Sequence, residues 1–206
     1  SFYVAIDIAP INLASFLNLA GEHFSALNVT SPHKNTVIDF CGKLSSTAQK
    51  TQSVNLLVFD NDTITGDNLD VLGFKSLVSR NEIPLNDKNV VVVGSGGVAR
   101  SVIHAISETS SPAAIYVASR DPDMTERKLE AYDYDYPVIP YHEMFRICDV
   151  VINCTPDSAE RALPKPPASK DSAGVAIDLV YNPARTVFLK IMEDAGWRIL
   201  NGEDMF

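Results

Sequence analysis

The sequence predicts an α/β fold in two parts. A small α/β domain covers residues 1–85, and a larger domain, built on a doubly wound parallel sheet, covers residues 86–206. Near residue 85 the polar, turn-rich stretch NEIPLNDK precedes NVVVVG, which is apolar enough for a strand buried on both faces. Beyond this point strand-like and helix-like patterns alternate, as is typical of parallel strands joined by crossover helices.

In the first part, FYVAIDI and SALNVT are strand-like and flank the apolar-periodic helix INLASFLNLAGEHF, which together predict a βαβ unit. A segment with helical character, HKNTVIDFCGKL, comes next and is followed by STAQKTQ. SVNLLVF then meets TITGDN across the turn cluster DND, which indicates a hairpin. The apolar residues after GDNLD are expected to be packed.

In the second part, the expected strands are 89–94, 113–119, 149–155, 174–181 and 197–200, with a short PVIP strand at 137–140. The expected helices are 97–107, 122–132, 141–147 and 185–196. Two tracts, YDYDY at 132–136 and PKPPASK at 164–170, are expected to be solvated loops.

Composition narrows the function classes. The net charge is −9 and the 17 Lys and Arg residues are dispersed, which argues against a nucleic-acid surface. No apolar run reaches the roughly 18 residues of a membrane span. The three cysteines have no disulfide or metal-ligand pattern and the histidines no ligand spacing, so we expect free thiols, a cytoplasmic location and no metal. The oligomeric state, monomer or homodimer, stays open.

A glycine-rich loop lies between an apolar strand and a helix in VVVVGSGGVARS. This context is typical of a Rossmann-like dinucleotide site, because glycines let backbone amides approach a pyrophosphate whose charge the helix N-terminus favours. The spacing is GxGG, shorter than the full GxGxxG fingerprint. The residues expected to hold the cofactor are Gly94, Ser95, Gly96, Gly97 and Val98.

The end of the next strand reads ASRDPD, and it bears on the choice of nucleotide. An arginine there accommodates a 2′-phosphate, whereas an acid hydrogen-bonds a ribose hydroxyl. Ser119 and Arg120 favour NADP, while Asp121 is what an NAD site would offer. We expect NADP, with NAD as the alternative.

Three polar residues of the first part, Lys34, Asn55 and Asp70, stand near predicted strand ends, where ligands bind in open α/β sheets. Together with their surroundings, seven motifs in order resemble the shikimate dehydrogenase family: NVTSPHK, SVNLLVF, GDNLDVLGF, VVVVGSGGVARS, INCTPD, AIDLVYNP and NGEDMF. The resemblance implies a substrate domain, an NADP domain and a reaction in the cleft between them. The implied activity is NADPH-dependent reduction of 3-dehydroshikimate to shikimate in aromatic amino-acid biosynthesis.

The resemblance also implies residue roles. It places catalysis on Lys34 and Asp70, as a coupled pair, since the hydroxyl proton needs a group to accept or supply it. It implies substrate hydroxyl contacts by Thr30, Asn55 and Tyr181, and nicotinamide contacts by Thr155, Leu179 and Gly202.

The sequence departs from the family pattern at several positions, among them Gln52, where the family usually has glycine. The family's first strand, its Ser-x-Ser-Pro motif and its last helix are expected to lie beyond this chain, as in a fragment, or to be missing, as in a shortened paralogue. Two other functions therefore stay open: an NAD-dependent quinate/shikimate dehydrogenase, and a dehydrogenase-like protein that binds nucleotide without turnover.

Overall fold

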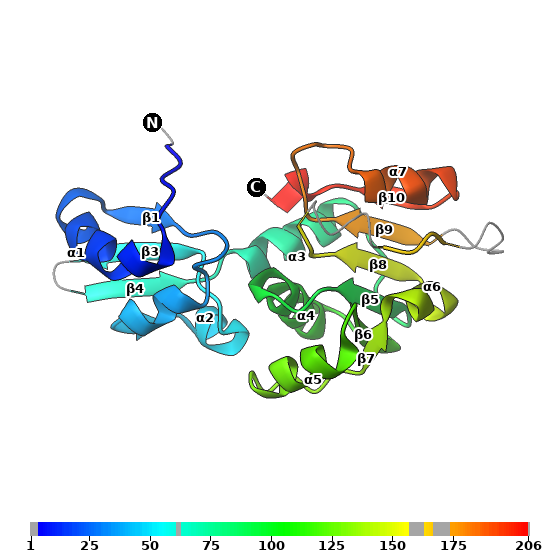
Figure 1. The fold of residues 1–206 in the computed structure, drawn as a ribbon. Helices are drawn as coiled ribbons and strands as arrows, with labels where there is room; N and C mark the ends of the chain where they lie inside the picture. Colours follow the sequence, from blue (N-terminus) through cyan, green and yellow to red (C-terminus); the bar gives the residue numbers. More distant parts are fainter. Residues whose placement is uncertain (1–3, 61–62, 157–162, 167–173, 206) are drawn as a thin grey trace. The chain divides into compact units, whose positions relative to one another are not determined.

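The computed structural model describes residues 4–60, 63–156, 163–166 and 174–205. The chain divides into two compact units, residues 1–69 and residues 70–206 (Figure 1). The division falls before the helix α3 (Asp70–Arg80), whereas the expected domain boundary near residue 85 lies after it. By its contacts α3 belongs with the second unit, where Val71, Phe74 and Leu77 enter the core.

The first unit is built on a four-stranded sheet with the order β1-β3-β4-β2. The pair β3–β4 is antiparallel, with Leu57 opposite Gly66, and confirms the predicted hairpin; the turn residues 61–62 lie outside the described residues. β1 pairs with β3 antiparallel and β2 pairs with β4 in parallel. The strands are β1 (Ala26–Asn28), β2 (Lys43–Leu44), β3 (Leu56–Asp60) and β4 (Thr63–Asp67).

The helices of the first unit are α1 (Leu13–His23), α2 (Ser46–Thr51) and the 3-10 turns η1 (Pro10–Asn12) and η2 (Thr36–Phe40). Leu13 and Leu17 of α1 are one helical turn apart and meet Leu57 of β3 in the core. The predicted helix at 11–24 is confirmed. Of the helical segment expected at 33–44, only the five residues of η2 are helical.

The predicted strand at 2–8 is wrong over its described part. Residues 4–9 carry no strand pairing, and Val4 and Ile6 are 74% and 49% exposed. Within the described chain β1 pairs only with β3, in the antiparallel sense, so the expected βαβ unit does not form. Alternating apolar residues predict a strand only where a neighbouring strand satisfies the backbone groups.

The second unit contains a six-stranded parallel sheet with the order β10-β9-β8-β5-β6-β7. The chain enters at β5, runs outward through β6 and β7, and then returns to the other side of β5 with β8, β9 and β10. This order confirms the predicted doubly wound α/β architecture and puts a topological switch point between β5 and β8. The strands are β5 (Asn89–Val93), β6 (Ala114–Ser119), β7 (Val138–Pro140), β8 (Val150–Asn153), β9 (Val175–Asp178) and β10 (Arg198–Leu200).

Side-chain alternation along β5 explains why helices cover both faces of this sheet. Val90 and Val92 pack in one core with α3 and α4, whereas Val91 and Val93 pack in the other with α6 and α7 (Figure 1). The remaining helices are α4 (Gly97–Thr109), α5 (Pro122–Glu130), α6 (Met144–Ile147) and α7 (Val187–Asp194), with the 3-10 turns η3 (Tyr141–Glu143) and η5 (Gly202–Met205).

Two further findings concern the described residues as a set. None of the helices among them combines the length and apolar character that a membrane crossing needs. Their His, Cys, Asp and Glu side chains form no group of three or more that could hold a metal ion.

Candidate active site

A cleft of about 430 Å³ opens at the carboxyl ends of β5, β6 and β8 in the second unit. Six of the residues expected to hold the cofactor line it: Gly94, Ser95, Ser119, Arg120, Asp121 and Thr155. Met124, Thr125 and Tyr141 complete the lining. Three strand ends that are far apart in the sequence therefore meet at one site, because parallel strands end at the same edge.

The glycine loop has the backbone geometry that a dinucleotide needs. Gly94 has a φ of +102°, and a β-carbon there would lie 3.0 Å from Cγ2 of Thr155. Both the conformation and the close approach favour glycine. Gly96 is exposed, and a β-carbon there would meet nothing within 4 Å, so its backbone faces open space. Gly97 and Val98 begin α4.

The segment after β6 offers a cation, while its carboxylate is already engaged. Asp121 caps α5, since its Oδ1 accepts a hydrogen bond from the Met124 amide at 3.0 Å. Arg120 is exposed and lies near Tyr141: burial raises the pKa of the Tyr141 phenol, and Arg120 acts in the opposite direction. Ser119 shares a 2.7 Å hydrogen bond with Thr125. The residues present thus fit a dinucleotide whose ribose carries a phosphate.

A buried polar network supports the loop that carries Thr155. Asn153, at the end of β8, accepts hydrogen bonds from the amide and the hydroxyl of Thr155, at 3.1 and 2.6 Å. Its own amide group donates to Asp178 Oδ1 at 3.2 Å. Neither Asn153 nor Asp178 is exposed to solvent. A buried network whose polar groups are satisfied in this way rigidifies the residues that it joins.

Asp178 extends this network to the loop after β9. Its two carboxylate oxygens accept from the Val180 amide at 3.1 Å and from the Thr186 hydroxyl at 2.7 Å. Thr186 in turn caps α7 by accepting from the Leu189 amide at 3.2 Å. Neither Asn153 nor Asp178 was among the predicted site residues. Their signal was a polar residue closing each of two apolar strands, in DVVIN and GVAID.

Two of the expected nicotinamide contacts are neighbours in space. A β-carbon on Gly202 would lie 2.4 Å from the Leu179 carbonyl oxygen, so only glycine allows η5 to pack on the end of β9. Thr155 lines the cleft described above, whereas Leu179 and Gly202 do not. Tyr181, expected to contact substrate, is 54% exposed and lines neither that cleft nor the cavity described next.

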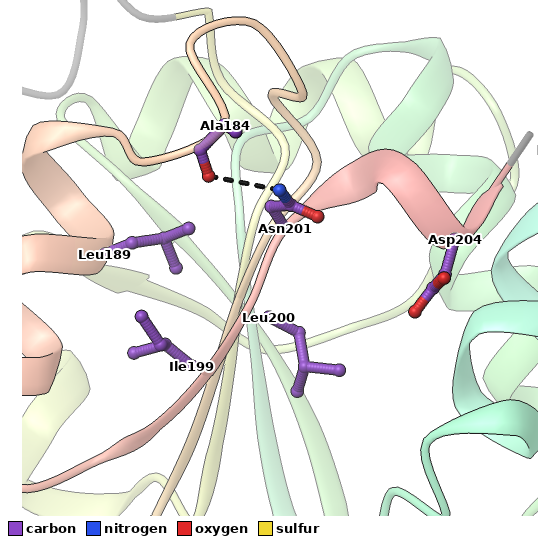
Figure 2. Close-up of a pocket in the computed structure, with 6 residues that line it drawn as sticks. All are labelled: Ala184, Leu189, Ile199, Leu200, Asn201 and Asp204. Atoms are coloured by element: carbon purple, nitrogen blue, oxygen red, sulfur yellow. Dashed lines mark hydrogen bonds between the residues drawn. The ribbon is translucent and has the colours of Figure 1, made fainter.

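A second, smaller cavity of about 270 Å³ lies between α7 and the chain end of the second unit (Figure 2). Its lining consists of Ala184, Leu189, Ile199, Leu200, Asn201 and Asp204. The Asn201 side-chain amide donates to the Ala184 carbonyl at 3.1 Å across its upper edge. None of the predicted site residues lines this cavity.

Asp70, the expected catalytic carboxylate, is the first residue of α3, where the helix dipole favours a negative charge. It lies close to the end of β8. The pKa of the Cys154 thiol is held well above its usual value by burial first, and then by the charges of Asp178 and Asp70. The Cys154 thiol, which is half-buried, is therefore protonated and a poor nucleophile. Asp70 thus lies near enough to the end of β8 for its charge to act on Cys154.

The first unit brings Thr30, Lys34 and Asn55 together. The Val54 amide donates to the Lys34 carbonyl at 2.8 Å, and the Val29 amide donates to the Asn55 carbonyl at 2.8 Å. These bonds hold the turn after β1 alongside the start of β3. Lys34 and Asn55 are half-buried and Thr30 is exposed. The Asn55 side chain also accepts from the Leu69 amide at 2.8 Å.

Comparison with known proteins places this arrangement in a family. Residues 1–57 match the family model described as the shikimate dehydrogenase substrate binding domain, and residues 89–180 match the model described as NADP oxidoreductase, coenzyme F420-dependent. A protein of Thermoplasma acidophilum named shikimate dehydrogenase (NADP(+)) is 35% identical, over 100% of this chain and 75% of the relative. One of the same name from Oleidesulfovibrio alaskensis is also 35% identical, over 99% of this chain and 74% of its own length.

The solved structures agree with this placement. Shikimate 5-dehydrogenase from Thermus thermophilus, crystallised in complex with NADP(H) and shikimate, superimposes with a TM-score of 0.82 and 26% identity, covering 97% of this chain and 75% of that one. A chorismate mutase/shikimate 5-dehydrogenase fusion protein from Clostridium acetobutylicum gives a TM-score of 0.81 at 30% identity, over 97% of this chain and 73% of the fusion protein. The chain belongs to the shikimate dehydrogenase family.

Proposed function

We propose that this chain is an NADP-dependent shikimate dehydrogenase, which interconverts 3-dehydroshikimate and shikimate in aromatic amino-acid biosynthesis. The observation that carries the proposal is the cleft in which the glycine loop, Arg120 and Thr155 meet, in a chain 35% identical to proteins named for this activity. When bound, the nucleotide supplies or accepts the hydride. The protein must then bind the substrate hydroxyls and move one proton.

Lys34 is the proposed proton-transfer residue. In the reducing direction its ammonium donates a proton to the carbonyl oxygen as that oxygen becomes a hydroxyl, and in the oxidising direction the amine takes the proton back. Asp70 is proposed to act together with Lys34 and to bind a substrate hydroxyl. Thr30 and Asn55, which the first unit holds beside Lys34, are proposed to bind substrate hydroxyls, as is Tyr181.

NADP is the preferred nucleotide in this proposal. Asp121 is occupied as the cap of α5, and Arg120 is the exposed cation of the cleft. The opposite choice, an NAD-dependent quinate/shikimate dehydrogenase, is the second candidate, because Asp121 lines the same cleft. Leu179 and Gly202 join Thr155 as proposed nicotinamide contacts, and Gly97 and Val98 complete the glycine loop.

The cellular location and the oligomeric state belong to the same proposal. A cytoplasmic location is supported by the three cysteines, which are all thiols. The protein is proposed to be a monomer or a homodimer in solution. Light scattering coupled to size-exclusion chromatography measures its molar mass and decides between the two.

The direct test is an assay of reduced nicotinamide by absorbance, with shikimate or quinate as substrate and NADP or NAD as oxidant. Turnover of shikimate with NADP supports the proposal. A preference for quinate with NAD selects the second candidate. Nucleotide binding without turnover of either substrate contradicts both and favours a binding protein.

Replacing the proposed proton-transfer residue gives a sharper result. Lys34→Ala is expected to lower kcat by about two orders of magnitude or more while cofactor affinity stays nearly unchanged, because only transition-state stabilisation is removed. Stopped-flow turnover and NADPH fluorescence titration measure the two quantities. Lys43→Ala is the matched control, since Lys43 is an exposed lysine of the same unit. An equal loss of cofactor binding in Lys34→Ala would contradict the assignment.

A further inference from the structure

Arg100, on α4, is a fully buried arginine with 0% of its surface exposed. It is also among the largest side chains that are completely covered. Burying a guanidinium is costly unless its donors are used, and well-packed apolar residues often replace buried charges without loss of stability. A buried arginine is therefore better explained by what it positions than by the stability it contributes.

The contacts of Arg100 connect the glycine loop to a second segment. Its Nη1 donates to the Ser95 carbonyl at 3.4 Å, and its Cζ lies 3.9 Å from the centre of the Tyr132 ring. Burial lowers the pKa of the guanidinium, while Tyr132 and Tyr134 act in the opposite direction. A planar cation over an aromatic face is a favourable arrangement when water is excluded.

Tyr132 begins the YDYDY tract, for which the expectation of a solvated loop is wrong. Its tyrosines are half-buried and its two aspartates are exposed, in strict alternation. The Tyr134 hydroxyl donates to the Arg100 backbone carbonyl at 3.3 Å, and Tyr136 shares a 3.0 Å hydrogen bond with Ser107. The tract thus runs along α4 and contacts it at three points, the first of which is the guanidinium.

The hydrogen bond from Arg100 to the Ser95 carbonyl also fixes the direction of the next backbone N–H in the glycine loop. In a planar trans peptide the carbonyl and the following N–H point in opposite directions. Because Arg100 holds the Ser95 carbonyl toward the protein interior, the Gly96 N–H is turned the other way. Gly96 is the exposed glycine whose surroundings are open. An amide fixed in this direction is ready to donate to an anion without reorganisation.

We propose that Arg100, seated on Tyr132, is a positioning residue for the cofactor: it fixes the Ser95–Gly96 peptide so that the loop presents an amide to the diphosphate of the dinucleotide. This inference rests on the proposed function only in taking NADP as the ligand of the glycine loop. It assigns to Tyr132 and Tyr134 of the YDYDY tract the role of holding Arg100 in place.

Binding measurements with two ligands test the role. Arg100→Met is expected to weaken NADP binding by about tenfold or more, while adenosine 2′-monophosphate, which lacks the diphosphate, binds within about twofold of its wild-type affinity. Isothermal titration measures both constants, and thermal melting shows whether the variant is folded. In steady state the KM for NADPH rises with kcat little changed.

Three variants keep the test decisive. Arg100→Lys retains the charge without the planar fork and is expected to lie between wild type and Arg100→Met. Tyr132→Leu removes the aromatic seat and leaves the arginine, so it serves if Arg100→Met does not fold, with the same selective loss of NADP affinity expected. Tyr136→Phe removes the distant contact with Ser107 and is the matched control, with wild-type affinity for both ligands.

Two results overturn the inference. Equal weakening of NADP and adenosine 2′-monophosphate in folded Arg100→Met would show a general loosening of the domain, and unchanged NADP affinity would show that Arg100 does not act on the loop. Both results are independent of substrate turnover by the wild-type protein. If the wild-type protein binds NADP but does not oxidise shikimate, the proposed activity is contradicted, whereas the inference about Arg100 is not.

Discussion

At the scale of single residues, Ser53 is a buried hydroxyl that finds no hydrogen-bond partner among the described atoms. A buried donor without a partner has lost its bond to water and gained nothing in return. Ser53→Ala is therefore expected to raise the free energy of unfolding by up to about 1 kcal/mol. Urea denaturation measures the change. Ser101→Ala, which removes a hydroxyl that donates to Gly97 at 2.9 Å, is the control and is expected to give no such gain.

The two glycines of the loop are expected to respond differently to the same substitution. Gly94→Ala places a β-carbon at a φ of +102° and against Thr155, so it should cost about 1 kcal/mol or more of stability and also weaken NADP binding. Gly96→Ala meets no neighbour and should keep the stability. If the Gly96 amide binds the diphosphate, as proposed above, a methyl group at this position should weaken NADP binding alone. Thermal melts and titrations separate the two effects, and identical stabilities would refute the explanation for Gly94.

The sequence predicts the role of a residue where its local context is distinctive. Glycines between a buried strand and a helix mark a phosphate loop, and Ser119, Arg120 and Asp121 follow from their place at the next strand end. Asn153, Asp178 and Arg100 could not be predicted as a supporting set. Their partners lie as far as 34 residues away along the chain, and only the folded unit brings them together.

At the scale of elements, the cap of α5 also decides how the cleft is charged. Asp121→Ala removes the acceptor for the Met124 amide and should destabilise the protein by about 1 kcal/mol. Asp121→Asn keeps a good capping residue and removes the charge, so stability should hold while affinity for NADP rises relative to NAD. Chemical denaturation and titration with both nucleotides measure these quantities. If Asp121→Asn instead binds NAD more tightly relative to NADP, the main role of Asp121 is a contact with the ribose and not the cap of α5.

Elements with a strong period or a buried strand pattern were predictable, and those that depend on a partner were not. The hairpin β3–β4 and the strands of the parallel sheet follow from the sequence pattern. The expected strand at 2–8 fails because pairing is a tertiary property, and α3 was missed because its apolar residues suggested packing without a clear helical start. Gln52, where the family usually has glycine, has a φ of +48° and ends α2 in the left-handed conformation that glycine suits best.

At the scale of the whole molecule, groups whose pKa is raised on folding make the free energy of unfolding depend on pH in the alkaline range. Burial raises the pKa of Tyr134 from 10.0 to about 12, and it raises the pKa of the Cys41 and Cys154 thiols as well. A group whose pKa is raised on folding contributes stability that is complete below the unfolded pKa and is lost as the pH rises through the folded one. For Tyr134 the loss falls between about pH 10 and about pH 12.

Unfolding free energies measured across this range should fall with pH, and Tyr134→Phe should reduce the slope between about pH 10 and about pH 12. The thiols should add a loss that begins above about pH 9, which Cys41→Ala reduces. Tyr181→Phe is the control, because it removes a tyrosine that is 54% exposed, and it should leave the slope unchanged. A slope that is unchanged in Tyr134→Phe would contradict the burial of this phenol.

The doubly wound architecture of the second unit was foreseen from the alternation of strands and helices, but that alternation did not settle where the chain divides into units. Polar, turn-rich residues near 85 indicate a loop, whereas the contacts divide the chain after Leu69 because α3 packs with α4 and η5. A β-carbon on Gly73 of α3 would lie 2.6 Å from the Met205 carbonyl oxygen. The close packing of α3 on η5 therefore requires glycine at position 73, and the residues next to Gly73 in the sequence do not reveal this requirement.

The sole tryptophan, Trp197, is buried in the second unit, edge to face with Phe145 at 5.8 Å. Intrinsic indole emission therefore observes only the nucleotide-binding half, whereas circular dichroism observes both halves together. Heating curves recorded by the two optical signals will coincide if the halves melt as one cooperative block, and will separate if each melts at its own temperature, with no label attached.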